Sequence, residues 1–280
     1  MYKYTNKTVL RGILVILIIL CVVPTALPVF SAAPACYNWY CMRTKDHTRP
    51  KTDAALSWID DKEYNVVYLD PQCSDESTQE NRVLYLTFDV GYENGNVSKV
   101  LDVLREKNVP GAFFVLSHVF EAEGELISRI QNEGHLLCNH TAHHKNMAKV
   151  TDQNTFVKEL IELESICMEK TGQKVSKFYR PPEGKFTKEQ LLWAKELGYQ
   201  TVLWSFAYAD WDNEHQPSHA EAIQKITENL HNGAILLLHP TSATNAAVLG
   251  EIIDYCHENG YRFESLTHLS EADTGEENVQ

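Results

Sequence analysis

The stretch Val83-Leu84-Tyr85-Leu86-Thr87-Phe88-Asp89-Val90-Gly91-Tyr92-Glu93-Asn94-Gly95 decides the fold of this chain. Its first residues are apolar or β-favouring, and they run directly into the carboxylate of Asp89, a glycine and a polar turn. A short apolar run bounded by turn signals predicts a strand that is buried on both faces. A carboxylate at the carboxyl end of such a strand lies where α/β folds place their chemistry, although an aspartate there can also cap a helix or tie a turn.

The same pattern repeats along the rest of the chain. After residue 83, short apolar runs alternate with amphipathic segments in about seven strand–helix units, which predicts a parallel sheet. One unbroken series over roughly 200 residues favours an irregular (β/α)7-type barrel with an N-terminal extension, and a doubly wound open sheet is the alternative. The later strands are expected at 111–116, 135–138, 177–179, 200–204, 234–238 and 261–264, and the main helices at 154–170, 188–197, 220–231 and 246–259.

The first 35 residues have the pattern of a targeting segment. Lys3, Lys7 and Arg11 precede a continuous apolar run, and Ala33-Pro34-Ala35 fits the small-residue pattern of a cleavage site. The apolar run is nearly long enough to span a bilayer, so a membrane anchor is the alternative to a cleaved signal peptide. In either case we expect the rest of the chain to be secreted or to act at the outer face of the cytoplasmic membrane.

The charge balance limits the class of partner. With 38 acidic residues against 25 basic ones, the chain carries a formal charge of −13 at pH 7. Nucleic-acid binding needs a basic surface, so nucleic acid is excluded as a partner. The chain also has no dinucleotide-binding glycine fingerprint and no phosphate-binding lysine loop. A neutral or weakly charged polysaccharide is compatible with this charge, and we expect a monomer.

The cysteines do not form a zinc-type pattern. Export permits disulfides, and Cys36 and Cys41 are close enough along the chain to pair locally, but their spacing alone does not show that they do. Cys138 falls in an expected strand, and Cys167 and Cys256 fall in expected helices, where buried free thiols are common. No two C-x-x-C motifs are present.

Reactive side chains follow the expected strands at five places. Because parallel strands present their carboxyl ends at one edge, we expect these side chains to converge on one face. The five groups are Asp89, the cluster His140-Thr141-Ala142-His143-His144, Arg180 before two prolines, Asp210 with Trp211, and His239.

Each of these groups has a functional and a purely structural interpretation. His140 and His144 are four residues apart, so one helical turn would direct both imidazoles at a common metal ion, but such pairs on surface helices are usually solvated. Arg180 could hold a carboxylate through paired hydrogen bonds or form an ordinary surface ion pair. His239 could be a proton donor whose pKa is set by a carboxylate such as Asp210, or a satisfied core histidine.

Taken together and in this order, the motifs resemble those of polysaccharide deacetylases of the NodB-homology type. The resemblance covers about residues 83–266. The continuation Gly91-Tyr92-Glu93-Asn94-Gly95 is similar to the delta-lactam-forming subgroup, which deacetylates muramic acid in spore peptidoglycan. The five motifs correspond here to Thr87-Phe88-Asp89-Val90-Gly91, His140-Thr141-Ala142-His143-His144, Arg180-Pro181-Pro182-Glu183-Gly184, Asp210-Trp211 and Leu237-Leu238-His239.

The resemblance implies an organisation for the whole chain and an activity. It implies an exported hydrolase that removes N-acetyl groups from amino sugars of cell-wall polysaccharide, with peptidoglycan as the main candidate and the muramic acid of spore cortex as the finer one. The expected parts are a signal peptide or membrane anchor at 1–35, an extension wrapping the barrel at 36–80, the deacetylase domain at 81–269 and an acidic disordered tail at 270–280.

The resemblance also implies roles for the reactive residues. Asp89 would act as the general base and be positioned by Arg180, and His239 would act as the general acid with its pKa set by Asp210. The remaining implied contacts, to the substrate or to its oxyanion, are Glu183 through its backbone N–H, Trp211 and Tyr92.

One position departs from the family's pattern. A divalent metal, zinc by preference, would be held by His140 and His144, but the family's usual third ligand is replaced by Val90. Valine cannot coordinate a metal, and a catalytic zinc site normally has three protein ligands and a water. Two alternatives therefore stay open, namely a catalytically weakened glycan-binding protein on the same fold and an esterase that removes O-acetyl groups from sugars.

Overall fold

The computed structural model describes residues 35–44, 46–60 and 62–271. The expected targeting segment therefore lies outside the described residues, apart from residue 35, and so does the acidic tail from residue 272 onward. The first two residues assigned to that tail are described, and they belong to helix α8 (Thr267–Glu271). None of the helices in the described ranges combines the length and the hydropathy that a membrane span requires.

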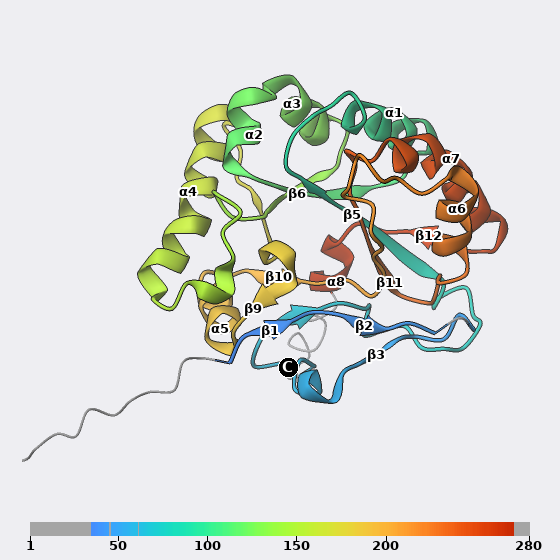
Figure 1. Ribbon diagram of the computed structural model, residues 1–280, viewed down its shortest axis with the longest axis horizontal. Coiled ribbons are helices and arrows are strands. Elements are labelled where there is room, and N and C mark those ends of the chain that lie inside the picture. Colours follow the sequence, from blue (N-terminus) through green and yellow to red (C-terminus); the bar gives the residue numbers. More distant parts are fainter. Residues whose placement is uncertain (1–34, 45, 61, 272–280) are drawn as a thin grey trace, which may run out of the picture. The chain divides into compact units, whose positions relative to one another are not determined.

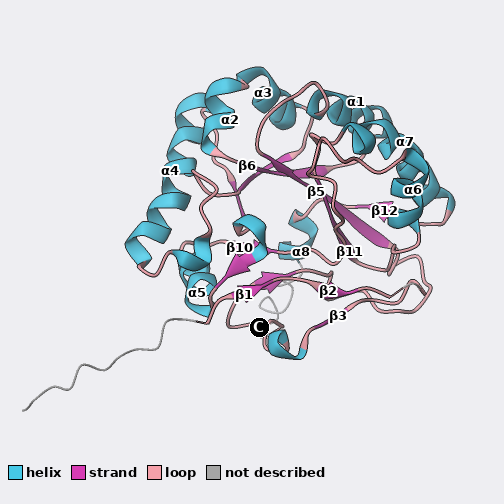
Figure 2. Cartoon of the chain, viewed as in Figure 1, coloured by secondary structure: helices cyan, strands magenta, loops and turns pink. Residues whose placement is uncertain are grey.

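A curled parallel sheet forms the centre of the described chain (Figures 1 and 2). Its strands follow the order β11-β5-β6-β7-β8-β10-β4, β12 also pairs with β5, and these strands all pair in parallel. The strands are β4 (Val66–Val67), β5 (Val83–Val90), β6 (Gly111–Val115), β7 (Leu136–Asn139), β8 (Ser176–Tyr179), β10 (Gln200–Val202), β11 (Ala234–Leu238) and β12 (Arg262–Phe263).

The two edges of this sheet approach each other. Leu69, just after β4, forms a β-bridge with Ala234 at the start of β11. Phe206, which follows β10, forms a second bridge with Leu236 in the same strand. The expected irregular (β/α) barrel is therefore confirmed, and the open-sheet alternative is wrong.

Helices cover the outer face of the sheet (Figure 2). In β5, Leu84, Leu86 and Phe88 belong to the apolar cluster that includes buried residues of α1 and α7, whereas Tyr85 belongs to a cluster inside the curled sheet. Side chains alternate across a strand, so burial of both faces explains why apolar residues occur at consecutive positions in the first part of β5. The helices are α1 (Val97–Lys107), α2 (Ser117–Ala122), α3 (Gly124–Asn132), α4 (Gln153–Thr171), α5 (Lys188–Glu196), α6 (His219–Thr227) and α7 (Ala243–Glu258), and short 3-10 turns lie at Ala54–Leu56, Met147–Lys149 and Pro182–Gly184.

The extension at 36–80 contributes to the sheets of the domain. Its strand β1 (Tyr37–Asn38) pairs with β9 (Lys185–Phe186), and β2 (Cys41–Met42) pairs with β3 (Lys51–Thr52), both antiparallel. β4 also comes from this extension, and it forms an edge of the central sheet beside β10. Two-residue strands show no detectable period, which is why the sequence does not predict their pairing.

Some element boundaries differ from the expected ones. Helix α7 begins three residues earlier than expected, at Ala243, because Ser242 caps it by accepting a hydrogen bond from the Asn245 N–H at 3.0 Å. The helix expected at 220–231 already ends at Thr227, and His231 turns inward to hydrogen-bond Ser205 at 2.8 Å. The six described cysteines are free thiols, so the local pairing that the sequence allows near the N-terminus is not formed.

Replacing Phe113 with alanine should destabilise the fold strongly. Phe113 in β6 is fully buried, and its ring stacks on that of Phe88 with the centroids 4.9 Å apart. The truncation leaves a cavity, so urea denaturation should show a loss of about 3–5 kcal/mol in the free energy of unfolding. The control is Ile161→Ala on α4, where the side chain is 38% exposed and the change should stay within about 0.5 kcal/mol. Equal losses in the two variants would contradict the core described here.

Candidate active site

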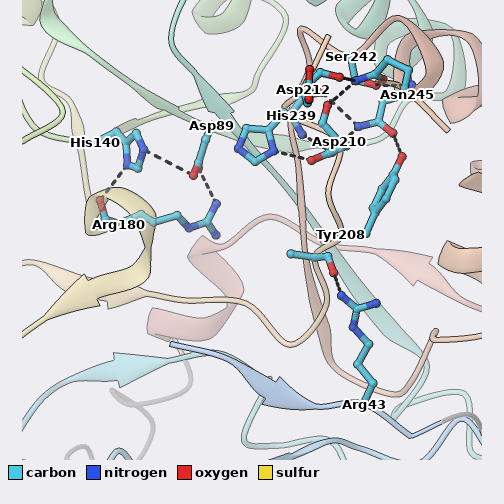
Figure 3. Close-up of polar contacts among 12 residues, drawn as sticks. Arg43, Asp89, His140, Arg180, Tyr208, Asp210, Asp212, His239, Ser242 and Asn245 are labelled. Carbon is cyan, nitrogen blue, oxygen red and sulfur yellow. Dashed lines mark hydrogen bonds and ion pairs between the residues drawn. The ribbon is translucent and has the colours of Figure 1, made fainter. Parts of the chain in front are cut away.

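A cleft of about 690 Å³ opens at the carboxyl ends of the central strands. Asp89 lies near the end of β5, His140 directly follows β7 and His239 directly follows β11, and all three side chains line this cleft. Arg180 follows β8 and Asp210 lies in the loop after β10, and both are fully buried behind the lining residues. The structure thus brings together the five groups that the sequence placed after strand ends (Figure 3).

The carboxylate of Asp89 is held by a buried arginine. Arg180 Nη1 donates to Asp89 Oδ1 at 2.8 Å, and Nη2 donates to Thr87 Oγ1 at 2.9 Å. Arg180 Nε donates to the carbonyl oxygen of Val202 at 3.1 Å, and the guanidinium carbon lies 4.1 Å from the ring centre of Phe114. A guanidinium can be buried here because its donors find acceptors and its charge has a partner. Arg180 is therefore not a surface ion-pair residue.

These neighbours set the protonation state of Asp89. Burial by itself raises the pKa of a carboxylic acid. At Asp89 the His140, Arg180 and His239 side chains outweigh burial, and they hold the pKa of this carboxyl below its ordinary value. Asp89 is consequently an anion around neutral pH, with Oδ1 occupied by the arginine and Oδ2 directed at the cleft side.

His140 and His144 converge across a tight loop, so the helical turn expected from their spacing is wrong. Thr141 and His144 have left-handed backbone angles, with φ of 72° and 53°, so the segment is not helical. The His144 N–H donates to Thr141 Oγ1 at 3.0 Å, which closes the loop. The two imidazole centroids lie 5.1 Å apart, whereas His143 points away and contacts Glu159.

His140 presents one ring nitrogen to the cleft. Its Nδ1 lies 2.9 Å from the carbonyl oxygen of Arg180, which can only accept, so Nδ1 carries the proton. Nε2 is then left facing Asp89 Oδ2 at 3.5 Å. Burial lowers the pKa of His140 to about 4, so the ring is neutral near pH 7. A neutral imidazole anchored through its other nitrogen is the common arrangement of a metal-binding histidine.

The donor set around His140 fits a divalent ion only in part. His144 supplies a second imidazole, but Val90 is fully buried in the apolar cluster under the helices and supplies no donor. Among the residues that the structure describes, no group of three or more His, Cys, Asp or Glu side chains is arranged to hold a metal. The residues therefore fit an ion held weakly by two histidines, and they do not fit a three-ligand zinc site.

A buried carboxylate supports His239. Asp210 Oδ1 lies 2.7 Å from His239 Nδ1, and Asp210 Oδ2 accepts from the His239 backbone N–H at 2.8 Å. Asn245 Nδ2 also donates to Oδ2, at 2.6 Å, and Tyr208 donates its hydroxyl proton to Asn245 Oδ1 (Figure 3). Burial lowers the pKa of His239, but the Asp210 carboxylate outweighs burial and raises that pKa above its ordinary value. The ring is 25% exposed in the cleft, so His239 is not a core histidine.

The three residues expected at the substrate line the same cleft. Glu183 has a φ of 59°, and the N–H groups of the two residues after it donate to carbonyls within the turn, whereas no backbone hydrogen bond from the Glu183 N–H is found among the described residues. Trp211 is 61% exposed, and its ring centroid lies 6.1 Å from that of His239. Tyr92 is also exposed. Exposed aromatic rings beside polar groups suit an amphipathic ligand such as a sugar.

Three supporting residues of the site, Thr87, Tyr208 and Asn245, are not among those predicted from the sequence. Thr87 could be found from the sequence, since it lies two positions before Asp89 and therefore shares its face of β5. Tyr208 and Asn245 form their hydrogen bond only because helix α7 packs beside the loop after β10. No local pattern carries that information.

Comparison with known proteins agrees with this geometry. The family model described as "Polysaccharide deacetylase" matches residues 76–202. The Bacillus subtilis peptidoglycan-N-acetylmuramic acid deacetylase PdaA is 38% identical over 233 residues, which is 83% of this chain and 85% of PdaA. The chain belongs to the polysaccharide deacetylase family.

A structural comparison and a second relative extend this result. The solved structure of Bacillus subtilis PdaA, described as a family 4 carbohydrate esterase, matches with a TM-score of 0.78 at 35% identity and covers 85% of this chain and 98% of that one. A peptidoglycan-N-acetylglucosamine deacetylase of Bacillus cereus is 34% identical over 188 residues, which is 66% of both chains. The family resemblance drawn from the five motifs is thereby confirmed.

Replacing Asp210 with asparagine should lower the pKa of His239. The amide keeps the size of the side chain but removes the charge that raises this pKa, so the effect of burial then dominates. NMR titration of the His239 imidazole should show its midpoint moving to lower pH. Asp212→Asn is the matched control, because Asp212 holds His215 at 2.8 Å in the same way and its loss should leave His239 unchanged. A His239 midpoint that does not move in Asp210→Asn would refute the proposed electrostatics.

Proposed function

We propose that this chain is an exported peptidoglycan N-deacetylase. The main support is the position of Asp89 and His239 in one cleft, each backed by a buried partner of opposite charge. The His140, Arg180 and His239 side chains together lower the pKa of Asp89 against the effect of burial, and Asp210 raises the pKa of His239. Two titratable groups whose environments move their pKa values apart are the mark of a base and an acid that act in one reaction.

Asp89 acts as the general base toward the attacking water. Arg180 keeps the carboxylate ionised and engages Oδ1, so Oδ2 is the oxygen that accepts the proton. The water oxygen bonds to the N-acetyl carbonyl carbon, and the carbonyl oxygen becomes an oxyanion. The backbone N–H of Glu183 donates to that oxyanion, and a donor of this kind typically contributes about 3–4 kcal/mol to transition-state stabilisation.

His239 acts as the general acid toward the leaving amine. Its raised pKa favours the protonated ring, and Asp210 accepts from Nδ1, so the Nε2 proton faces the cleft. When the carbon–nitrogen bond breaks, this proton goes to the amine nitrogen and acetate is released.

A divalent ion belongs to the proposal with a limited role. His140 and His144 would hold it, zinc being the ion their nitrogens prefer, and it would polarise the N-acetyl carbonyl and lower the pKa of the attacking water. Because Val90 takes the place of a third ligand, we expect the ion to bind weakly. A chelator should therefore reduce activity when little divalent metal is present and have no effect when the metal is in excess.

The finer features of the proposal concern substrate and location. The acetyl group removed is that of muramic acid in peptidoglycan, in keeping with the similarity to PdaA, and Tyr92 and Trp211 contact the sugar rings. Residues 1–35 direct export or anchor the chain, the extension at 36–80 and the domain at 81–269 form the catalytic part, and 270–280 form an acidic tail. The protein acts as a monomer in the bacterial cell envelope.

One observation favours a second candidate. A catalytically weakened glycan-binding protein would keep its function with the apolar Val90 at the position of the third metal ligand. The paired base and acid argue against this, because binding alone has no need for the two opposed pKa shifts. An O-acetyl sugar esterase would use the same residues, but an alcohol leaving group depends less on the acid His239 than an amine does.

Incubation with the protein should lower the mass of peptidoglycan sugars by about 42 Da for each acetyl group lost by amide hydrolysis. Mass spectrometry of the separated sugars then identifies the substrate, and parallel incubations with chelator and with added zinc test the metal. Loss from muramic acid supports the proposal in full, and loss from glucosamine changes only the sugar. Binding without any mass change favours the glycan-binding protein, and loss confined to O-acetylated sugars favours the esterase.

Asp89→Asn should reduce acetate release by about 10²–10⁴-fold while leaving glycan binding intact, because the amide cannot accept the water's proton. The control is Asp102→Asn, since Asp102 accepts from Arg129 at the same 2.8 Å but lies on the exposed surface of α1. Equal release by Asp89→Asn and the unaltered protein would rule out Asp89 as the base.

A further inference from the structure

An extended segment near the N-terminus of the described chain packs against residues that line the cleft. We call Trp39–Arg43 the strap. Its alternate residues Trp39, Cys41 and Arg43 face the barrel, whereas Tyr40 and Met42 are 50% and 46% exposed. All three inward residues contact one segment, 204–207, which follows β10 and contributes to the cleft.

Trp39 makes two hydrogen bonds of equal length to two different loops. Its backbone N–H donates to the carbonyl oxygen of Gly184 at 2.8 Å. Its indole Nε1–H donates to the carbonyl oxygen of Trp204, also at 2.8 Å. Trp39 is only 5% exposed, so these bonds are shielded from water. One buried residue thus ties the turn at 181–184 to the segment at 204–208.

The contact at Gly184 is too close for any side chain. A Cβ placed on Gly184 would lie 2.8 Å from a ring carbon of Trp204 and 3.2 Å from the Cβ of Trp39, and the φ of 62° also requires glycine. The turn therefore packs directly against both tryptophans. The residue next to this contact is Glu183, whose N–H is the donor proposed for the oxyanion.

The segment at 204–208 is connected by hydrogen bonds to His239, the proposed general acid. The Trp204 ring lies 5.7 Å from the guanidinium carbon of Arg180, which holds the base. Further along the loop, Tyr208 donates to Asn245, and Asn245 donates to the Asp210 carboxylate that supports His239 (Figure 3). Arg43 fixes the middle of this segment by donating to the carbonyl oxygen of Ala207, and its guanidinium carbon lies 5.2 Å from the Phe206 ring centre.

We infer that the strap is part of the catalytic architecture and that Trp39 is a positioning residue, which sets the distance between the oxyanion-donor turn at 181–184 and the segment at 204–208. This inference rests on the proposed deacetylase function for its kinetic consequence. Trp39 does not touch substrate; it acts through Glu183 and through the loop that supports the acid. A displacement of such groups by about 1 Å is enough to lower a catalytic rate considerably.

The test compares Trp39→Phe with Trp58→Phe in the full chain. The first variant keeps an aromatic ring and the backbone bond to Gly184 but removes the indole donor to Trp204. Trp58 lies in the same extension and against the same apolar cluster, but its indole N–H donates locally, to the carbonyl oxygen of Ala55 at 2.9 Å. The two variants therefore lose bonds of the same kind, and only one of these bonds joins the cleft loops.

Trp39→Phe should lower kcat for acetate release by about 10-fold with KM within about twofold, and Trp58→Phe should leave both unchanged. Hydrogen–deuterium exchange should become faster in peptides covering 181–186 and 203–208 in Trp39→Phe alone, while both variants melt at similar temperatures. Equal kcat values in the two variants, or unchanged exchange in these peptides, would overturn the inference. If the unaltered protein releases no acetate, the proposed function fails, and the exchange data alone then decide whether Trp39 couples the loops.

Discussion

The cleft depends on the buried ion pair between Arg180 and Asp89. A guanidinium placed in the interior is unfavourable unless its charge is paired and its donors are used. Arg180 meets this condition by donating to Asp89 and Thr87 of β5 and to the Val202 carbonyl of β10, while its own carbonyl anchors His140 after β7. Satisfying this one side chain requires β5 and β10 to keep fixed positions relative to the end of β8, where Arg180 lies, and this arrangement forms the base of the site.

The surroundings of Asp89 and Asp210 give these two chemically similar carboxylates different roles. Asp89 faces the cleft beside a permanent cation, so it remains ionised with one oxygen free. Asp210 is fully enclosed, and its two oxygens are taken up by His239 and Asn245, so it can only orient and charge the imidazole. Environment, and not residue type, separates the base from the group that supports the acid.

Val90, the last residue of β5, contributes to the apolar core and not to the site. It continues the alternation of Leu84, Leu86 and Phe88, and it joins their apolar cluster beneath the helices. A residue on that face stabilises the sheet by burial and offers nothing to a metal. The proton-transfer residues Asp89 and His239 consequently carry the larger share of the proposed chemistry.

The sequence by itself determined the parallel sheet and indicated which residues gather at its carboxyl edge, whereas the closure of the sheet came from the bridges of Leu69 and Phe206 to β11. Alternating apolar runs and amphipathic helices dictate such a sheet, and parallel strands end at one edge, so groups following them, such as Asp89 and His239, must meet. Only the tertiary structure decided how they are held. The bond from Asn245 to Asp210 and the contacts of the strap join segments far apart in the chain, so no local period predicts them. The loop between His140 and His144 is local, but its left-handed angles fall on Thr141 and His144, which are not glycine and so do not signal such a turn.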